Sequence, residues 1–322
     1  MIKELSIKNF GLVSIDKCSD GQFEKGKDGV EAVFTTSDKK VEFISFGIKT
    51  LAYVKSSVGY PAYYPLHQAT ITKPVKAVMM DLDGTSVKSE EFWIWIIEMT
   101  VASLLDKLSF QFEEADLPFV SGHSVSEHLL YCIEKYCPDK SLDLARKLYF
   151  AHTDRELKKI SEGKGRMDAF TPVDGLKEFL TELKANGIKI GLVTSGLYEK
   201  AWPEILSAFL TIGMGNPKEY YDAIITAGYP LRDGKAGTLG ELSPKPHPWL
   251  YAEMAAVGLK MPFENRHSVV GIEDSAAGVC AIRLAGFSAI GLAGGNIVSG
   301  GTLGLCDHYC ATLEDVWNVI KP

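Results

Sequence analysis

The sequence predicts an α/β protein with a parallel β-sheet core, an inserted helical segment and a β-rich N-terminal extension. From Pro74 onward, short apolar runs alternate with stretches of helical periodicity, which is typical of a parallel sheet covered by helices. Between about residues 91 and 162, apolar residues recur at helical spacing. Before residue 74, apolar and polar residues alternate in several runs, which indicates antiparallel strands.

The N-terminal extension is expected to contain a β-hairpin. Alternation over residues 30–35, a polar turn at 37–40 and a second run over 41–46 give the pattern of two paired strands. Residues 60–65, which read YPAYYP, resemble a linker with aromatic side chains that pack on a neighbour. These tyrosines also allow a sugar-binding or partner surface, although a packed β-appendage is the favoured interpretation.

The core elements follow one another as strands and helices after Pro74. Strands are expected at residues 75–80, 188–193, 268–272 and 289–292. One helical face is formed by Leu176, Phe179, Leu180 and Leu183, at positions i, i+3, i+4 and i+7. A second helix begins near Pro248, with Leu250, Tyr251, Met254 and Val257 on one side, and a helix of small residues spans about 275–285.

Composition and charge narrow the class of protein. The 322 residues carry a formal net charge of −7, and such an acidic chain lacks the basic face that nucleic-acid binding needs. The most apolar stretch, residues 92–97, is far shorter than the roughly 20 residues that span a bilayer, and the N-terminus does not read as a signal peptide. The six cysteines form no CxxC pair, which indicates reduced thiols and a cytoplasmic protein.

Two polar motifs follow predicted strands directly. Asp81-Leu82-Asp83-Gly84-Thr85 places two carboxylates one residue apart, so one can attack phosphorus and the other can exchange a proton with the leaving oxygen. Thr194-Ser195-Gly196 offers a hydroxyl and backbone N–H groups that can hold a phosphate oxygen. Taken alone, each motif also reads as an ordinary turn.

Two further motifs flank helices. Lys245 lies between prolines in SPKPHP, where its charge can neutralise a phosphoryl group, although a solvated lysine is the plainer interpretation. Glu273 and Asp274 end a strand and precede a small-residue helix, so they are either caps of that helix or oxygen ligands for Mg²⁺. Because strand ends meet at one edge of a parallel sheet, the four motifs are expected to converge.

Taken together and in their order along the chain, the four motifs resemble those of the haloacid dehalogenase superfamily. The resemblance covers about residues 74–322. It implies a Rossmann-like core at residues 74–90 and 167–322, an inserted helical cap at 91–166, and an N-terminal extension at 1–73 of unknown role. It also implies that Asp81 is the nucleophile, Asp83 the acid/base and Lys245 the stabilising cation. Thr194 and Ser195 would bind the phosphoryl group with Lys245.

The same resemblance implies a Mg²⁺ cofactor held by Asp81, the backbone carbonyl of Asp83 and Asp274, with Glu273 as a second candidate. The function it implies is a phosphatase acting on a small phosphomonoester, such as a sugar phosphate, through an aspartyl-phosphate. Neither a nucleic-acid nor a membrane partner is expected, and the sequence is compatible with a monomer without fixing the oligomeric state.

A β-phosphoglucomutase-like mutase and a non-catalytic binding protein are the alternatives. Related mutase caps carry an arginine for the second phosphate, and Val125 falls at that position here, which weakens the mutase interpretation. The cap aromatics Phe92, Trp93 and Trp95 are expected mainly in the cap core rather than in the pocket. A long spacing between Thr194 and Lys245 predicts a surface loop near residues 231–241. The scattered histidines are expected to be structural or exposed; they are His123, His128, His152, His247 and His267.

Overall fold

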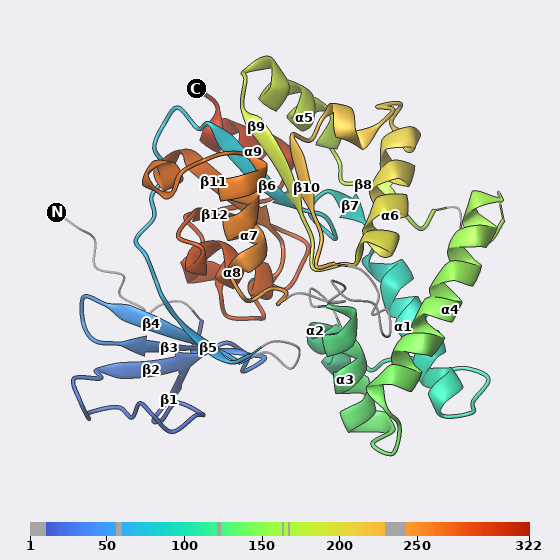
Figure 1. Cartoon of the computed structure of the whole chain (residues 1–322), viewed down its shortest axis with the longest axis horizontal. Helices are drawn as coiled ribbons and strands as arrows, with labels where there is room; N and C mark the ends of the chain where they lie inside the picture. The colour runs from blue at the N-terminus through green and yellow to red at the C-terminus, as the bar shows by residue number, and fades with distance from the viewer. Residues whose placement is uncertain (1–10, 56–59, 121–123, 163, 167, 229–242) are drawn as a thin grey trace.

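The computed structural model describes residues 11–55, 60–120, 124–162, 164–166, 168–228 and 243–322. Figure 1 shows a central sheet covered by helices, a group of helices to one side of it, and a small N-terminal sheet. The predicted loop at 231–241 and His123 lie outside the described residues. In the described part of the chain, no helix is long and apolar enough to cross a membrane. All six cysteines are free thiols.

The core is a parallel sheet of six strands in the order β10-β9-β6-β11-β12-β13. The strands are β6 (Ala77–Asp81), β9 (Lys189–Val193), β10 (Ala223–Ile225), β11 (Val269–Glu273), β12 (Ser288–Leu292) and β13 (His308–Cys310). All residues of β6, β11 and β12 are buried, which explains their almost continuous apolar sequences. The two edge strands are only three residues long, too short for a clear sequence signal.

Helices cover both faces of this sheet. They are α5 (Leu176–Ala185), α6 (Tyr198–Thr211), α7 (Trp249–Glu253), α8 (Ala276–Leu284) and α9 (Leu313–Ile320). Alternate residues of β6 enter different apolar clusters: Val78 and Met80 join the one that contains α5 and α6, and Met79 joins the one that contains α7 and α8. The prediction that Val257 lies on the buried side of its helix is wrong. A π-helical turn over Met254–Gly258 widens the helix there and leaves Val257 68% exposed.

The inserted segment is helical, as the sequence predicts. Its helices are α1 (Glu90–Leu104), α2 (Leu117–Val120), α3 (Val125–Tyr136) and α4 (Leu142–Ser161), with a 3-10 turn at Glu114–Asp116. Ser124 and Ser141 cap α3 and α4 by accepting hydrogen bonds from backbone N–H groups. Two short paired strands, β7 (Val87–Lys88) and β8 (Thr171–Pro172), join the segment to the core.

The N-terminal extension is an antiparallel sheet of five strands in sequence order. They are β1 (Val13–Ile15), β2 (Ala32–Thr35), β3 (Val41–Ser45), β4 (Thr50–Val54) and β5 (Ala62–Pro65). The predicted hairpin is confirmed as β2 and β3. The linker expected at 60–65 is wrong, because 62–65 form the edge strand β5. An edge strand tolerates Pro65, which cannot donate a backbone hydrogen bond.

Candidate active site

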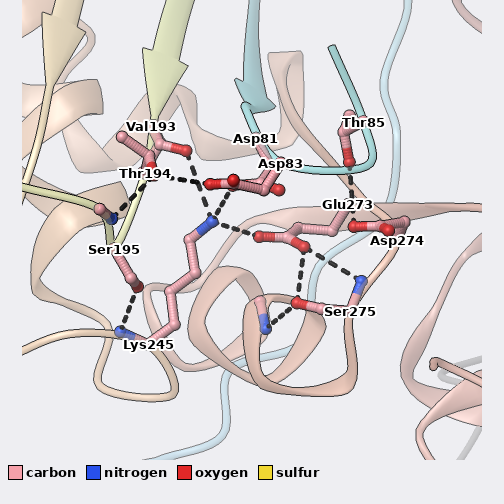
Figure 2. Close-up of polar contacts among 12 residues, drawn as sticks. Asp81, Asp83, Thr85, Val193, Thr194, Ser195, Lys245, Glu273, Asp274 and Ser275 are labelled. Carbon is pink, nitrogen blue, oxygen red and sulfur yellow. Dashed lines mark hydrogen bonds and ion pairs between the residues drawn. The ribbon is translucent and has the colours of Figure 1, made fainter. Parts of the chain in front are cut away.

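The sequence-predicted site residues converge at the carboxyl ends of β6, β9 and β11. A cavity of about 50 Å³ is lined by Asp81, Asp83, Thr194, Ser195, Lys245 and Asp274. Glu273 lies fully buried beside this cavity. Figure 2 shows these side chains pointing toward one another from separate elements.

Lys245 is the electrostatic centre of the group. Its ammonium contacts Asp81 Oδ1, lies 2.5 Å from Glu273 Oε1, and is within 3.4 Å of the Val193 carbonyl oxygen (Figure 2). The Lys245 backbone N–H donates to Ser195 Oγ at 3.2 Å, which ties the lysine loop to the end of β9. Burial opposes the charged form of Lys245, but the two carboxylates outweigh burial and raise the lysine pKa. The ammonium therefore stays charged at neutral pH.

Glu273 accepts hydrogen bonds on both carboxylate oxygens. Oε1 accepts from Lys245 and from the Tyr251 hydroxyl at 2.8 Å, and Oε2 accepts from Ser275 Oγ at 2.8 Å and Ser275 N–H at 3.2 Å. Asp274, by contrast, accepts from Thr85 Oγ1 at 3.3 Å and lines the cavity. Of the two predicted metal ligands, Asp274 is therefore the better placed, and Glu273 is placed to orient Lys245.

Asp81, Glu273 and Asp274, here called the acidic cluster, bring carboxylate oxygens within 4.8 Å of one another. Burial comes first among the causes that raise the pKa of both Asp81 and Asp274 well above the ordinary range, and repulsion from the other carboxylates adds to it. Lys245 offsets only part of this negative charge. A hard divalent cation would neutralise the rest through oxygen ligands, so the cluster fits Mg²⁺.

Gly84 makes room for Asp274. Its φ is +82°, and a Cβ at this position would overlap Asp274 Oδ2. Glycine alone has no steric cost in this backbone region, and it lets the Asp274 carboxylate approach the loop that follows Asp81. The glycine of the DxDG motif is thus required both for the turn and for the acidic cluster.

Asp83 faces three donors from different parts of the chain. Its Oδ1 accepts from Ser89 Oγ at 2.9 Å and lies 3.3 Å from Lys200 Nζ, while Oδ2 accepts from Thr194 Oγ1 at 3.4 Å. The Asp83 side chain is 28% exposed, whereas that of Asp81 is 7% exposed. The two carboxylates therefore lie in different environments, which suits a buried nucleophile and a proton carrier with access to water.

Sequence reasoning missed Lys200, Glu204 and their contact with the inserted segment. Lys200 lies over the Trp93 ring at 4.4 Å, and Trp93 Nε1 donates to Glu204 Oε2 at 2.8 Å. Burial, followed by the charge of Asp83, raises the pKa of Glu204 well above its usual range. Neither residue lies in one of the four motifs, so only the folded chain brings them to the site.

The inserted helices close the cavity from the other side. Glu90, Trp93, Val120 and His128 line it. Phe92 and Trp93 are both buried in the large apolar cluster, as expected for the cap core, but Trp93 also faces the cavity. His128 was expected to be structural or exposed; it is buried and also lines the cavity. Pockets for small ligands usually measure about 300–1,000 Å³, so this cavity is smaller than a typical ligand pocket.

A model of the haloacid dehalogenase-like hydrolases matches residues 75–286, and the chain belongs to this family. The N-terminal sheet lies outside the match. Val125, at the position where a mutase arginine was expected, is buried at the start of α3. The sequence has no significant match among curated proteins.

Solved structures share the fold at low sequence identity. A Haemophilus somnus protein described as a predicted phosphoglycolate phosphatase is 16% identical, with a TM-score of 0.58, over 78% of this chain and 100% of its own. CbbY from Rhodobacter sphaeroides, in complex with phosphate, is 21% identical, with a TM-score of 0.56, over 75% and 96% of the two chains. β-Phosphoglucomutase from Clostridium difficile is 22% identical, with a TM-score of 0.53, over 75% and 93%.

Proposed function

We propose that this protein is a Mg²⁺-dependent phosphatase that hydrolyses a small phosphomonoester, such as a sugar phosphate, through an aspartyl-phosphate. The observation that carries the proposal is the convergence of Asp81, Asp83, Thr194, Lys245 and Asp274 on one cavity. Membership of the hydrolase family supports a phosphatase, and the phosphate bound in CbbY is an example of a ligand in a similar fold.

In the first step, an Asp81 carboxylate oxygen attacks phosphorus and the ester P–O bond breaks. Asp83 gives its proton to the leaving oxygen. In the second step, Asp83 removes a proton from water, whose oxygen attacks the aspartyl-phosphate, releases inorganic phosphate and regenerates Asp81. The same residue thus acts as acid and then as base.

Three groups of the chain would hold the phosphoryl oxygens. Lys245 supplies a permanent charge beside the nucleophile, and Thr194 and Ser195 supply the hydroxyl and backbone donors at the end of β9. Mg²⁺, held by Asp81, the Asp83 carbonyl and Asp274 with Glu273 beside them, would offset the negative charge that phosphoryl transfer spreads over oxygen.

We further propose the division into an N-terminal extension at 1–73, a core at 74–90 and 167–322, and a cap at 91–166. The helices of the cap would open to admit the ester and close to exclude water. A cytoplasmic location is supported by six free cysteines.

The test is phosphate release from a panel of small phosphate esters with Mg²⁺ and with a chelator. Release that requires Mg²⁺ supports the phosphatase, and the best ester reports the preference of the cap. Isomerised sugar phosphate without net release would instead identify a mutase. Absence of turnover on every ester, together with no isomerisation, would favour a binding protein.

A further inference from the structure

The N-terminal sheet shares its apolar core with the elements that carry the active site. Val41 and Phe43 on β3 face the same side as their partners Val54 and Ala52 on β4, and each of these side chains is at most 1% exposed. They belong to one apolar cluster with Met79 of β6 and with Leu250 and Tyr251 of α7. The strand that ends at Asp81 and the helix after Lys245 therefore share one apolar cluster with the extension.

A side-chain hydrogen bond links this sheet to the lysine loop. Tyr64 of β5 lies with its hydroxyl 2.8 Å from Nδ1 of His247, two residues after Lys245. The two rings meet edge to face at 5.8 Å, and His247 is 1% exposed. Among the described residues, His247 Nε2 has no hydrogen-bond partner, so the contact with Tyr64 is the one that orients the ring.

The backbone of the same loop depends on where His247 lies. The His247 N–H donates to the Pro244 carbonyl at 2.9 Å and closes a turn around Lys245. Lys245 in turn donates its N–H to Ser195 Oγ and its ammonium to Asp81 and Glu273. His247 thus belongs to the same turn as Lys245, and the Tyr64 bond reaches this turn through the His247 side chain.

A second contact joins the extension to the other side of the cavity. Ser37, in the β2–β3 turn, donates from its hydroxyl to the Ser299 carbonyl at 2.7 Å and from its N–H to the Gly300 carbonyl at 3.2 Å. The loop that Ser37 contacts also contains Asn296, whose side chain accepts a hydrogen bond from the Ala276 N–H at 2.7 Å and lines the cavity. The sheet thus contacts both loops that flank the acidic cluster.

We propose that the N-terminal sheet is part of the active-site scaffold, with Tyr64 as a positioning residue that acts through His247 on Lys245. The catalytic consequence rests on the proposed function, because it assumes that Lys245 stabilises the transferred phosphoryl group. The structural consequence is an ordered lysine loop, and it does not depend on the proposed function. Tyr64 itself touches neither the cavity nor the acidic cluster.

The test compares Tyr64→Phe with Tyr63→Phe. Tyr63 is the adjacent residue of β5, and its hydroxyl donates to Asp20 within the extension, so its loss perturbs the sheet without touching the lysine loop. Tyr64→Phe keeps the ring and removes the bond to His247. We expect a fall in kcat of about 3- to 10-fold, the size of one neutral hydrogen bond, with KM changed less than about twofold. Tyr63→Phe is expected to leave kcat and KM at the wild-type values.

Amide hydrogen exchange over residues 243–253 gives a readout that does not need activity. Tyr64→Phe should speed exchange in this segment, and Tyr63→Phe should not. Equal effects of the two variants on exchange, or unchanged exchange and kcat in Tyr64→Phe, would overturn the proposal. Faster exchange in Tyr64→Phe, with no ester hydrolysed by the wild type, would support the positioning role and reject the proposed function instead.

Discussion

Replacing Glu273 by Gln separates the orientation of Lys245 from metal binding. The side chain keeps its shape but loses its charge, and an amide cannot accept hydrogen bonds on both ends. If the amide oxygen faces Lys245 and Tyr251, the amide nitrogen faces Ser275, whose N–H then loses its acceptor. With the opposite orientation, the nitrogen faces the Lys245 ammonium. Either way, the network that holds Lys245 loses at least one charge-assisted bond.

The expected size follows from that one bond. A hydrogen bond to a charged group contributes about 1.5–3 kcal/mol, which corresponds to a fall in kcat of roughly 10- to 150-fold if the whole effect is felt in the transition state. The Mg²⁺ concentration for half-maximal activity should change less than about threefold, because Asp274 keeps its charge. In Asp274→Asn, the matched variant, that concentration should rise by more than about tenfold.

The assay is initial velocity as a function of Mg²⁺ concentration at saturating ester, for wild type, Glu273→Gln and Asp274→Asn. Thermal unfolding of each variant checks that the fold is retained. The reasoning would be refuted if Glu273→Gln reached the wild-type kcat at high Mg²⁺ but needed a much higher Mg²⁺ concentration for half-maximal activity. Glu273 would then be a metal ligand and not a positioning residue for Lys245.

Three further predictions concern the site and its cover. Gly84→Ala should weaken Mg²⁺ activation at least tenfold, because the added Cβ would overlap Asp274. Gly175 has a similar positive φ but lies in open space, so Gly175→Ala is the control. It should lower the free energy of unfolding by only about 1–2 kcal/mol and leave Mg²⁺ activation unchanged. Trp93→Phe should lower the free energy of unfolding by about 1–3 kcal/mol, because the buried Glu204 carboxyl loses the hydrogen bond from Trp93 Nε1. Urea denaturation measures this change. An equal loss of unfolding free energy in Trp95→Phe would contradict the prediction. Carboxyl groups with raised pKa bind protons more tightly in the folded protein, so the contribution of Asp81 and Asp274 to stability without metal should fall as pH rises above about 4. Mg²⁺ binds the ionised carboxylates, so the rise in Tm that Mg²⁺ causes should become larger as pH increases above about 4. A rise in Tm that is independent of pH would count against a metal bound by this cluster.

The candidate site residues that could be predicted from the sequence are those whose signals are local. Asp81 and Asp83 directly follow a buried apolar strand, and Glu273 and Asp274 lie between a strand and a helix of small residues. Because strand ends of a parallel sheet share one edge, placing the motifs on strands was enough to bring them together. The buried strands of the core were predictable for the same reason, since burial on both faces requires continuous apolar runs.

The rest depends on contacts between segments far apart in the chain. Neither Lys200 nor Glu204 lies in one of the four motifs, and only the docking of Trp93 above them reveals a polar link to the site. Likewise, nothing local marks Tyr64 as the partner of His247, and the prolines around it suggested a linker instead of a strand. The two possible roles of Glu273 could be weighed only once its four hydrogen bonds were known.

The most direct test of the central claim is to trap the phospho-enzyme. Wild-type protein is mixed with a radiolabelled phosphate ester and Mg²⁺, quenched in acid within the first turnover, and digested for peptide mapping. We predict acid-stable, hydroxylamine-labile label on the peptide that contains Asp81, and none in Asp81→Asn, whose nearly isosteric side chain keeps the fold. Turnover retained in Asp81→Asn, or label on a different peptide, would contradict the assignment of Asp81 as the nucleophile.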